Sequence, residues 1–272
     1  MAFITDLLNY EFLRDALIAN VLIAFVTGMV SPVIVYKRLE FIGDGLAHAI
    51  FAGVAFAVIF NFNILLGSVL ATLLFAYLVY VLSNDTQIAE STAIGMLLPV
   101  FMSLGVILFS KSERYTTDVT SYLFGNILLI SKHDIYFIAA VLVFSILILL
   151  WKHYEISYWL ADETMAKFYG IKTNIVRFIV LVLVSTVVVA ALKLAGVIVM
   201  GAFLVLPGAF SKNYAKSLTS AILRSVVFNF MLSLLGFVTA YYFDLPPGPT
   251  IVLFLFTAFL ISTLFVKSKN GQ

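Results

Sequence analysis

The chain has 272 residues, of which 63% are hydrophobic and 11% are charged, and its mean hydropathy is +1.12. Soluble globular domains carry about 25% charged residues, so this composition excludes a soluble domain and predicts an integral membrane protein. The formal charge of +2 gives no reason to expect a nucleic-acid partner, and the absence of cysteine excludes disulfides, thiol catalysis and thiolate metal sites.

The first 13 residues mix apolar side chains with Asp6 and Glu11, ahead of the first long apolar segment. This pattern is typical either of a short amphipathic helix in the membrane interface or of a frayed terminus. The segment has neither a basic region nor a small-residue cleavage site, so we do not expect a removable signal peptide. The first membrane span is therefore expected to remain in the mature protein.

Apolar segments fill most of the remaining chain, and most approach the roughly 20 residues needed to cross a hydrocarbon core about 30 Å thick. We predict an all-α transmembrane bundle of nine spans, or eight if a short one fails to cross. The bundle is expected to form a single transmembrane domain over residues 1–272. The predicted spans are residues 15–36, 44–61, 64–82, 91–109, 135–151, 175–192, 196–210, 218–243 and 250–266.

Two longer interruptions separate these spans. Residues 111–134 are polar at both ends and carry the apolar run 122–130. That run is too short to span and is predicted to form an interfacial or re-entrant helix. Residues 152–174 form the longest polar interruption, and we expect them to lie outside the membrane.

Two segments contain signals for caps and turns. Within the longest polar interruption, Asp162 can cap a helix, Glu163 suits the positive end of that helix, and Gly170 can end it. Before the last span, the sequence Asp244-Leu245-Pro246-Pro247-Gly248-Pro249 is too rigid to be helical and is predicted to form a tight turn.

The distribution of basic residues predicts the orientation. With nine spans and an outside N-terminus, 11 of the 16 Lys and Arg residues fall on the inner side. Cytoplasmic loops of membrane proteins are enriched in Lys and Arg. We therefore expect the N-terminus outside the cell, and the C-terminus and residues 152–174 in the cytoplasm.

The strongest candidate site is the pair Asp44 and His48, four residues apart in an apolar segment. Residues at this spacing lie on the same face of a helix, so the carboxylate and the imidazole can bind one divalent metal ion. An ionised Asp inside a membrane helix costs about 2.5–3.5 kcal/mol and is normally tied to a pathway or a partner. The competing interpretation is that Asp44 is a loop residue close to Lys37 and Arg38.

A stripe of small residues beside this pair, Gly45, Ala49, Gly53 and Ala57, would let another helix approach closely. Two ligands are too few for a closed metal site, so a second copy of the chain would have to complete it. A homodimer would supply two Asp and two His side chains, a set that suits Zn²⁺ or Mn²⁺.

The remaining sequence contains few other candidates for chemistry. His133 and His153 are predicted to be solvated residues at the membrane interfaces. The chain has no glycine-rich phosphate loop of the G-x-x-x-x-G-K-[ST] type. Any ATP hydrolysis is therefore expected on a partner chain.

Several stretches, in this order, resemble the membrane permease subunit of bacterial zinc and manganese ABC importers. They are residues 41–49 around Asp44 and His48, 122–128, Asp162-Glu163 with Gly170, 196–207, and 244–253. The similarity runs almost from end to end, and the first and last stretches are the most specific. The chain departs from the family pattern at Gly45, where Ala is commoner, and at Gly208 and Phe210, where small residues are usual.

This resemblance implies a type II ABC importer-like permease, a homodimer with a central pathway in the lipid bilayer of the cell membrane. Its expected partners are a cytoplasmic ATPase dimer and an extracellular protein that delivers Zn²⁺ or Mn²⁺ as transported substrate, with no permanently bound cofactor. The resemblance suggests that Asp44 and His48 contact the metal. It also suggests that helices coupling the permease to the ATPase include Trp159, Asp162, Glu163, Phe168 and Gly170.

Other functions stay open at this point. One is an importer of chelated iron or of a cobalamin-like cofactor, which needs a wider pathway. Another is a secondary transporter or channel that works without ATP. A membrane-embedded enzyme is disfavoured because no intramembrane cluster of ionisable groups other than Asp44 and His48 is found. An Asp and His set does not choose among zinc, manganese and ferrous iron.

Overall fold

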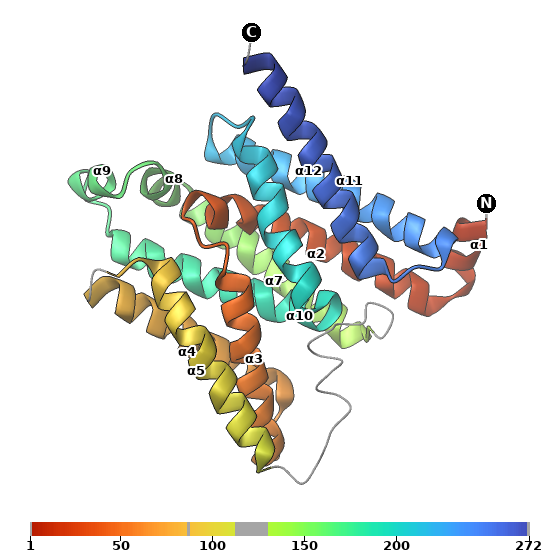
Figure 1. Ribbon diagram of the computed structural model, residues 1–272, viewed down its shortest axis with the longest axis horizontal. Coiled ribbons are helices and arrows are strands. Elements are labelled where there is room, and N and C mark those ends of the chain that lie inside the picture. The colour runs from red at the N-terminus through yellow and green to blue at the C-terminus, as the bar shows by residue number, and fades with distance from the viewer. Residues whose placement is uncertain (1, 86–87, 112–129, 271–272) are drawn as a thin grey trace.

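The structure is a computed structural model that describes residues 2–85, 88–111 and 130–270 (Figure 1). Every regular element in these residues is a helix, as predicted. The helices are α1 (Ala2–Asn9), α2 (Glu11–Tyr36), α3 (Ile42–Ile59), α4 (Ile64–Asp85), α5 (Glu90–Ser110), α7 (Lys132–Trp151), α8 (His153–Ala161), α9 (Glu163–Phe168), α10 (Thr173–Lys212), α11 (Leu218–Phe243) and α12 (Pro247–Asn270).

Eight helices in the described residues are long and apolar enough to cross a membrane. They are α2, α3, α4, α5, α7, the first part of α10 over Thr173–Leu192, α11, and α12 over Pro247–Leu264. The chain is therefore a multi-pass membrane protein. The helix predicted over 122–130 lies outside the described residues, except for Ile130.

Two groups of contacts define opposite ends of the bundle. At the α1 end, the ring of Phe3 packs edge-on against Tyr241 of α11 at 5.0 Å, and Asp6 accepts a hydrogen bond from the Tyr241 hydroxyl. The N-terminal segment is thus a packed helix rather than a frayed terminus. At the α9 end, Glu163 of α9 contacts Lys37, directly after α2, and Arg177 near the start of α10. Arg177 also contacts Glu90, the first residue of α5. Figure 1 shows the N-terminus and α8–α9 at opposite ends of the long axis.

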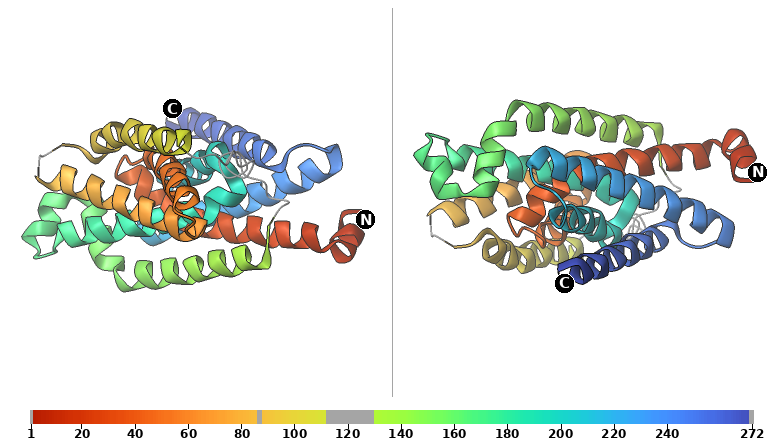
Figure 2. Two further views of the ribbon diagram at one scale, coloured as in Figure 1. Left: turned by 90° about the horizontal axis from the view of Figure 1, so that it is seen from below. Right: turned by 90° about the horizontal axis from the view of Figure 1, so that it is seen from above.

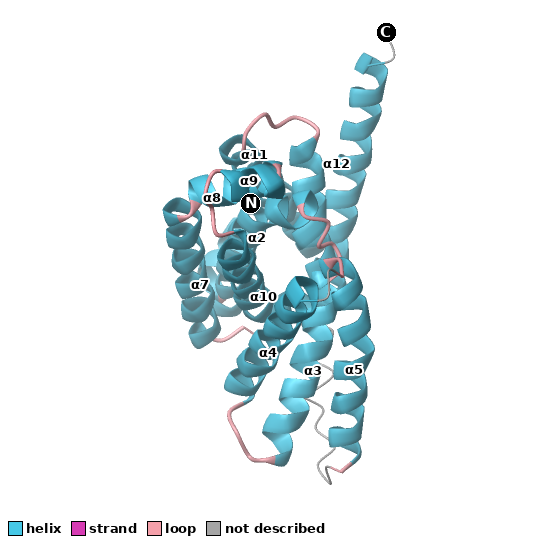
Figure 3. Ribbon diagram, turned by 90° about the vertical axis from the view of Figure 1, so that its left-hand side faces the viewer, coloured by secondary structure: helices cyan, strands magenta, loops and turns pink. Residues whose placement is uncertain are grey.

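The long helices form two groups around a shared core. Figure 2 shows α2, α7 and α11 extending along the long axis. Figure 3 shows α3, α4 and α5 grouped on one side of them. The predicted small-residue stripe lies inside this second group, where a Cβ atom on Gly53 would sit 2.4 Å from the carbonyl oxygen of Gly67 in α4. Only glycines allow α3 and α4 to cross this closely.

Helix α10 bends sharply at Gly196, whose backbone adopts φ 71° and ψ 170°. Its first turns lie at the α9 end, and so does its last residue, since the Lys212 ammonium lies 5.6 Å from the ring centre of Tyr36 at the end of α2. The second part, Val199–Lys212, therefore returns toward the end from which α10 started.

This returning part corresponds to the predicted span 196–210. At 1.5 Å per residue, Val199–Lys212 is about 21 Å long. It is too short for a hydrocarbon core of about 30 Å. The count of long spans in the described residues is thus eight, the smaller of the two numbers predicted, with one additional short return.

The predicted rigid turn before the last span is only half as long as expected. Asp244 adopts a left-handed conformation with φ 52° and ends α11, and Leu245 donates its N–H to the carbonyl of Ala240. Helix α12 then begins at Pro247, so Pro247 and Gly248 are helical. The prediction of a non-helical 247–249 is wrong because prolines are tolerated in a first turn, where the N–H groups have no partner inside the helix.

Candidate functional site

Asp44 lies in the first turn of α3 and His48 lies one turn further. The connection before them folds into the bundle, because Leu39 is 2% exposed and Ile42 is 1% exposed. The Leu39 N–H donates to the carbonyl of Ile34 in the last turns of α2 and holds this connection against the helix end. Asp44 is therefore a helical residue and not part of an exposed loop.

The accessible side of α3 is a narrow strip that carries this pair. Between Ile42 and Ala55, every residue is buried except Asp44, His48 and Phe51, which are partly accessible. Helices α4, α5 and α10 pack against the other sides of α3. The carboxylate and the imidazole are thus the polar groups that α3 offers to anything outside its own helix contacts.

One copy of the chain does not hold a complete metal site in its described residues. No group of three or more His, Cys, Asp or Glu side chains comes close enough there to bind a metal ion. Asp44 and His48 supply two ligands, whereas a closed zinc site has four. A metal held firmly at this strip would need further ligands from water or from another molecule.

The second candidate region is formed by α8 and α9, between two long helices. Asp162 caps α9 as predicted, since its carboxylate accepts hydrogen bonds from the N–H groups of Thr164 at 2.7 Å and Met165 at 2.9 Å. Gly170 adopts φ 80° just after α9, which explains why glycine ends this helix.

Glu163 is the centre of a cluster of charges at the α9 end. It accepts hydrogen bonds from Arg177 of α10, and it pairs with Lys167 at 3.2 Å and with Lys37 at 4.0 Å. Burial raises the pKa of Glu163, but these cations, Arg177 first, outweigh it and hold the pKa of that carboxyl below its usual range. The Arg177 guanidinium also lies 2.9 Å from a carboxylate oxygen of Glu90 in α5.

The residues predicted to couple to an ATPase differ sharply in exposure. Trp159 is 1% exposed, and the Lys37 ammonium lies 4.0 Å from its ring centre, so this side chain anchors α8 inside the protein. Phe168 is 83% exposed at the end of α9, and its neighbours Met165 and Tyr169 are exposed as well. Asp162 and Gly170 are exposed too, so Trp159 is the one residue of the predicted set that the protein itself buries.

Sequence reasoning missed the roles of Glu90 and Arg177 and treated Lys37 only as the end of a span. A signal was available, since each is a charged residue within about one turn of the end of an apolar segment. What the sequence did not reveal is that the end of α2 and the starts of α5 and α10 meet beside α9.

Comparisons with known proteins identify the family of the chain. The model of the ABC 3 transport family matches residues 9–266. The chain belongs to the ABC 3 transport family. Among the relatives of this family member is a "Probable metal transport system membrane protein" of Thermotoga maritima, 46% identical over 96% of this chain and 92% of the relative. Another is the manganese transport system membrane protein MntC of Listeria monocytogenes, 30% identical over 99% of this chain and 96% of the relative.

A solved structure supports the same assignment. One chain of PsaBC from Streptococcus pneumoniae, in complex with a Fab, superposes with a TM-score of 0.84 at 32% identity. The match covers 96% of this family member and 94% of the solved chain. The chain thus shares the fold of this PsaBC chain over nearly its whole length.

Proposed function

We propose that two copies of this chain form the membrane pathway of an ABC importer for a divalent transition metal ion, with manganese favoured over zinc. Relatives that align over nearly the whole chain are named as manganese transport proteins, including MntC of Listeria monocytogenes and ScaB of Streptococcus gordonii. In this proposal the whole chain acts as one permease domain.

The observation that carries the proposal is the position of Asp44 and His48 on the accessible strip of α3. Two such strips facing each other across a two-fold axis would bring together two carboxylates and two imidazoles. Carboxylate oxygens and imidazole nitrogens suit Mn²⁺ and Zn²⁺. Because the metal must be released after binding, a set assembled between two subunits suits a transient contact better than four ligands within one subunit.

The energy is proposed to come from a separate cytoplasmic ATPase dimer. The chain lacks a phosphate loop of its own. The exposed apolar side chains of α9, with Phe168 the most exposed, are the proposed docking surface for that partner. The cluster of Glu163 with Arg177 would transmit the movement of α9 to α5 and α10.

The orientation follows from the same proposal. The α9 end carries Lys37, Lys167, Lys172, Arg177 and Lys212, and a bias of this kind marks the cytoplasmic side. The α1 end then faces outward, where an extracellular binding protein would deliver the metal. The C-terminus, after α12, would lie in the cytoplasm, because the Tyr214 hydroxyl at the α9 end bonds to the carbonyl of Ser262.

The test is reconstitution of the chain with its ATPase and binding protein in vesicles loaded with a metal indicator. ATP-dependent entry of Mn²⁺, with Zn²⁺ as competitor, is the expected result. Entry of a metal chelate that free Mn²⁺ does not inhibit would instead identify a chelate importer. Entry without ATP or ATPase would identify a secondary transporter.

A further inference from the structure

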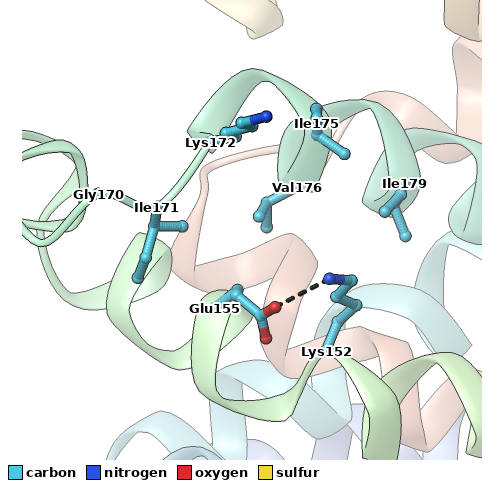
Figure 4. A pocket seen from close by; sticks show the side chains of 8 residues that line it. All are labelled: Lys152, Glu155, Gly170, Ile171, Lys172, Ile175, Val176 and Ile179. Carbon is cyan, nitrogen blue, oxygen red and sulfur yellow. Dashed lines mark hydrogen bonds and ion pairs between the residues drawn. The ribbon is translucent and has the colours of Figure 1, made fainter.

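A cavity of about 300 Å³ opens at the α9 end, between the start of α8 and the start of α10 (Figure 4). It is distinct from the Asp44 strip and from the exposed face of α9. Its polar lining comes from Lys152, Glu155 and Lys172, and its apolar lining includes Ile171, Ile175 and Ile179. The cavity therefore combines a charged rim with an apolar wall.

Two exposed aromatic residues indicate the level of this cavity in the bilayer. Trp151, the last residue of α7, is 72% exposed, and Tyr154 in the first turn of α8 is 77% exposed. Trp and Tyr concentrate at the boundary between acyl chains and headgroups. Lys152 follows Trp151 directly, so the charged rim lies at the depth of lipid headgroups.

The rim carries a net positive charge. The Lys152 ammonium donates to Glu155 at 2.8 Å and lies 4.4 Å from the ring centre of Trp151. Lys172 is exposed and stands at the N-cap of α10, where no side chain caps the helix. The rim thus has two cations and one anion, beside the positive end of the α10 dipole. This excess of positive charge favours a ligand with a single negative charge.

The apolar wall follows α10 away from the rim. Ile175 and Ile179 are four residues apart and so lie on one face of the helix, and both are accessible. Figure 4 shows them along the same side of the cavity as Lys172, with Lys152 opposite. A ligand that fills both parts must carry a negative charge at one end and an apolar chain at the other.

We propose that this cavity binds one anionic phospholipid, with its phosphate between Lys152 and Lys172 and one acyl chain along Ile175 and Ile179. Basic pockets between membrane helices at the headgroup level are typical sites for such lipids. The lipid would brace the junction of α8 and α10 that flanks α9. This inference does not depend on which metal the protein carries.

Native mass spectrometry of the full-length chain in mild detergent tests the proposal, with dioleoylphosphatidylglycerol as probe. At about 1 kcal/mol per lysine near a headgroup, the double variant K152Q/K172Q is expected to bind this lipid about 30-fold more weakly. The control K212Q/K216Q removes the same charge from the same end of the bundle and should bind it like the wild type. Dioleoylphosphatidylcholine should bind much more weakly than the anionic lipid.

Three results would overturn the site. The first is equal binding of phosphatidylglycerol to K152Q/K172Q and to K212Q/K216Q. The second is binding of soluble glycerol 3-phosphate as tight as that of the lipid, which would identify a free phosphate ligand. If the double variant does not fold, K172Q changes only an exposed side chain, and a loss of less than about fivefold there would be the third.

Discussion

Arg177 in α10 donates hydrogen bonds from Nη2 to both carboxylate oxygens of Glu163 in α9, at 2.8 Å and 3.0 Å. On its other side, Nε of the same guanidinium lies 2.9 Å from Glu90 in α5. One largely buried side chain thus joins the short helix α9 to two long helices. A planar guanidinium suits this bridging position better than an ammonium, since it presents donors in several fixed directions.

Replacing Arg177 by Gln should destabilise the protein. The change leaves Glu90 and Glu163 partly buried without their shared cation, and we expect a loss of about 1–3 kcal/mol. The measurement is the melting temperature of the purified chain in detergent. The control R14Q removes an exposed arginine at the α1 end and should leave the melting temperature nearly unchanged. Equal melting of the two variants would contradict the bridging role.

Acidification should remove the contribution of Glu163. Its pKa in the folded protein is lowered from 4.5, so the carboxylate stabilises the fold fully above pH 4.5. That contribution is lost as the pH falls through the lowered value, where the folded carboxyl takes up its proton. The melting temperature of the wild type should therefore exceed that of E163Q by a constant amount near neutral pH, and the difference should shrink below about pH 4.5. If the difference between the two melting temperatures grew on acidification, the pKa of Glu163 would not be lowered in the folded protein.

Replacing Asp44 by Asn should abolish metal uptake while assembly stays intact. Removing a residue that only hydrogen-bonds to a metal ligand typically lowers metal affinity about 10–100-fold. Removing a ligand itself should therefore cost at least that much. The measurement is ATP-dependent Mn²⁺ entry into vesicles, together with the amount of ATPase that co-purifies. The control E40Q removes a carboxylate from the connection just before α3. Normal uptake by D44N would exclude the proposed contact.

Much of the fold was predictable because the bilayer imposes a simple length rule. Helix ends fell within a few residues of the predicted spans at Tyr36, Trp151 and Phe243. The cap at Asp162 and the stop at Gly170 were equally predictable, since both depend on neighbouring residues only. The pair Asp44 and His48 could be placed on one face by spacing alone.

What could not be predicted depends on contacts between distant segments. The reversal before residue 196 was predicted, but the close packing of the returning part of α10 against α2, where Gly208 donates its N–H to the Ser31 hydroxyl at 2.6 Å, was not. The bridge from Glu90 to Arg177 joins residues 87 positions apart. The contact of the Lys37 ammonium with the buried ring of Trp159 likewise joins segments that are far apart in the chain.

Replacing Phe168 by Ala should weaken docking of the ATPase. Large exposed aromatic residues at the centre of an interface often contribute about 2 kcal/mol or more, which corresponds to about 30-fold in affinity. Co-purification at limiting ATPase concentration measures the change. The control Y136A truncates an exposed aromatic residue in the first turns of α7, at the end of the bundle where Lys132 pairs with Glu11. Unaltered co-purification of F168A would remove Phe168 from the docking surface.

Two glycines of α10 should respond in opposite ways to the same substitution. Gly196 holds φ 71° and ψ 170°, a conformation almost restricted to glycine, so G196A should cost about 1–3 kcal/mol and lower the melting temperature. Gly201 lies in the helical return, and a Cβ atom there would meet nothing within 4 Å. Because alanine favours a helix over glycine by about 0.5–1 kcal/mol, G201A should leave the melting temperature unchanged or raise it. If G196A melted at or above the temperature of G201A, the bend would not require glycine, and the return of α10 would have to be imposed by its packing against α2 alone.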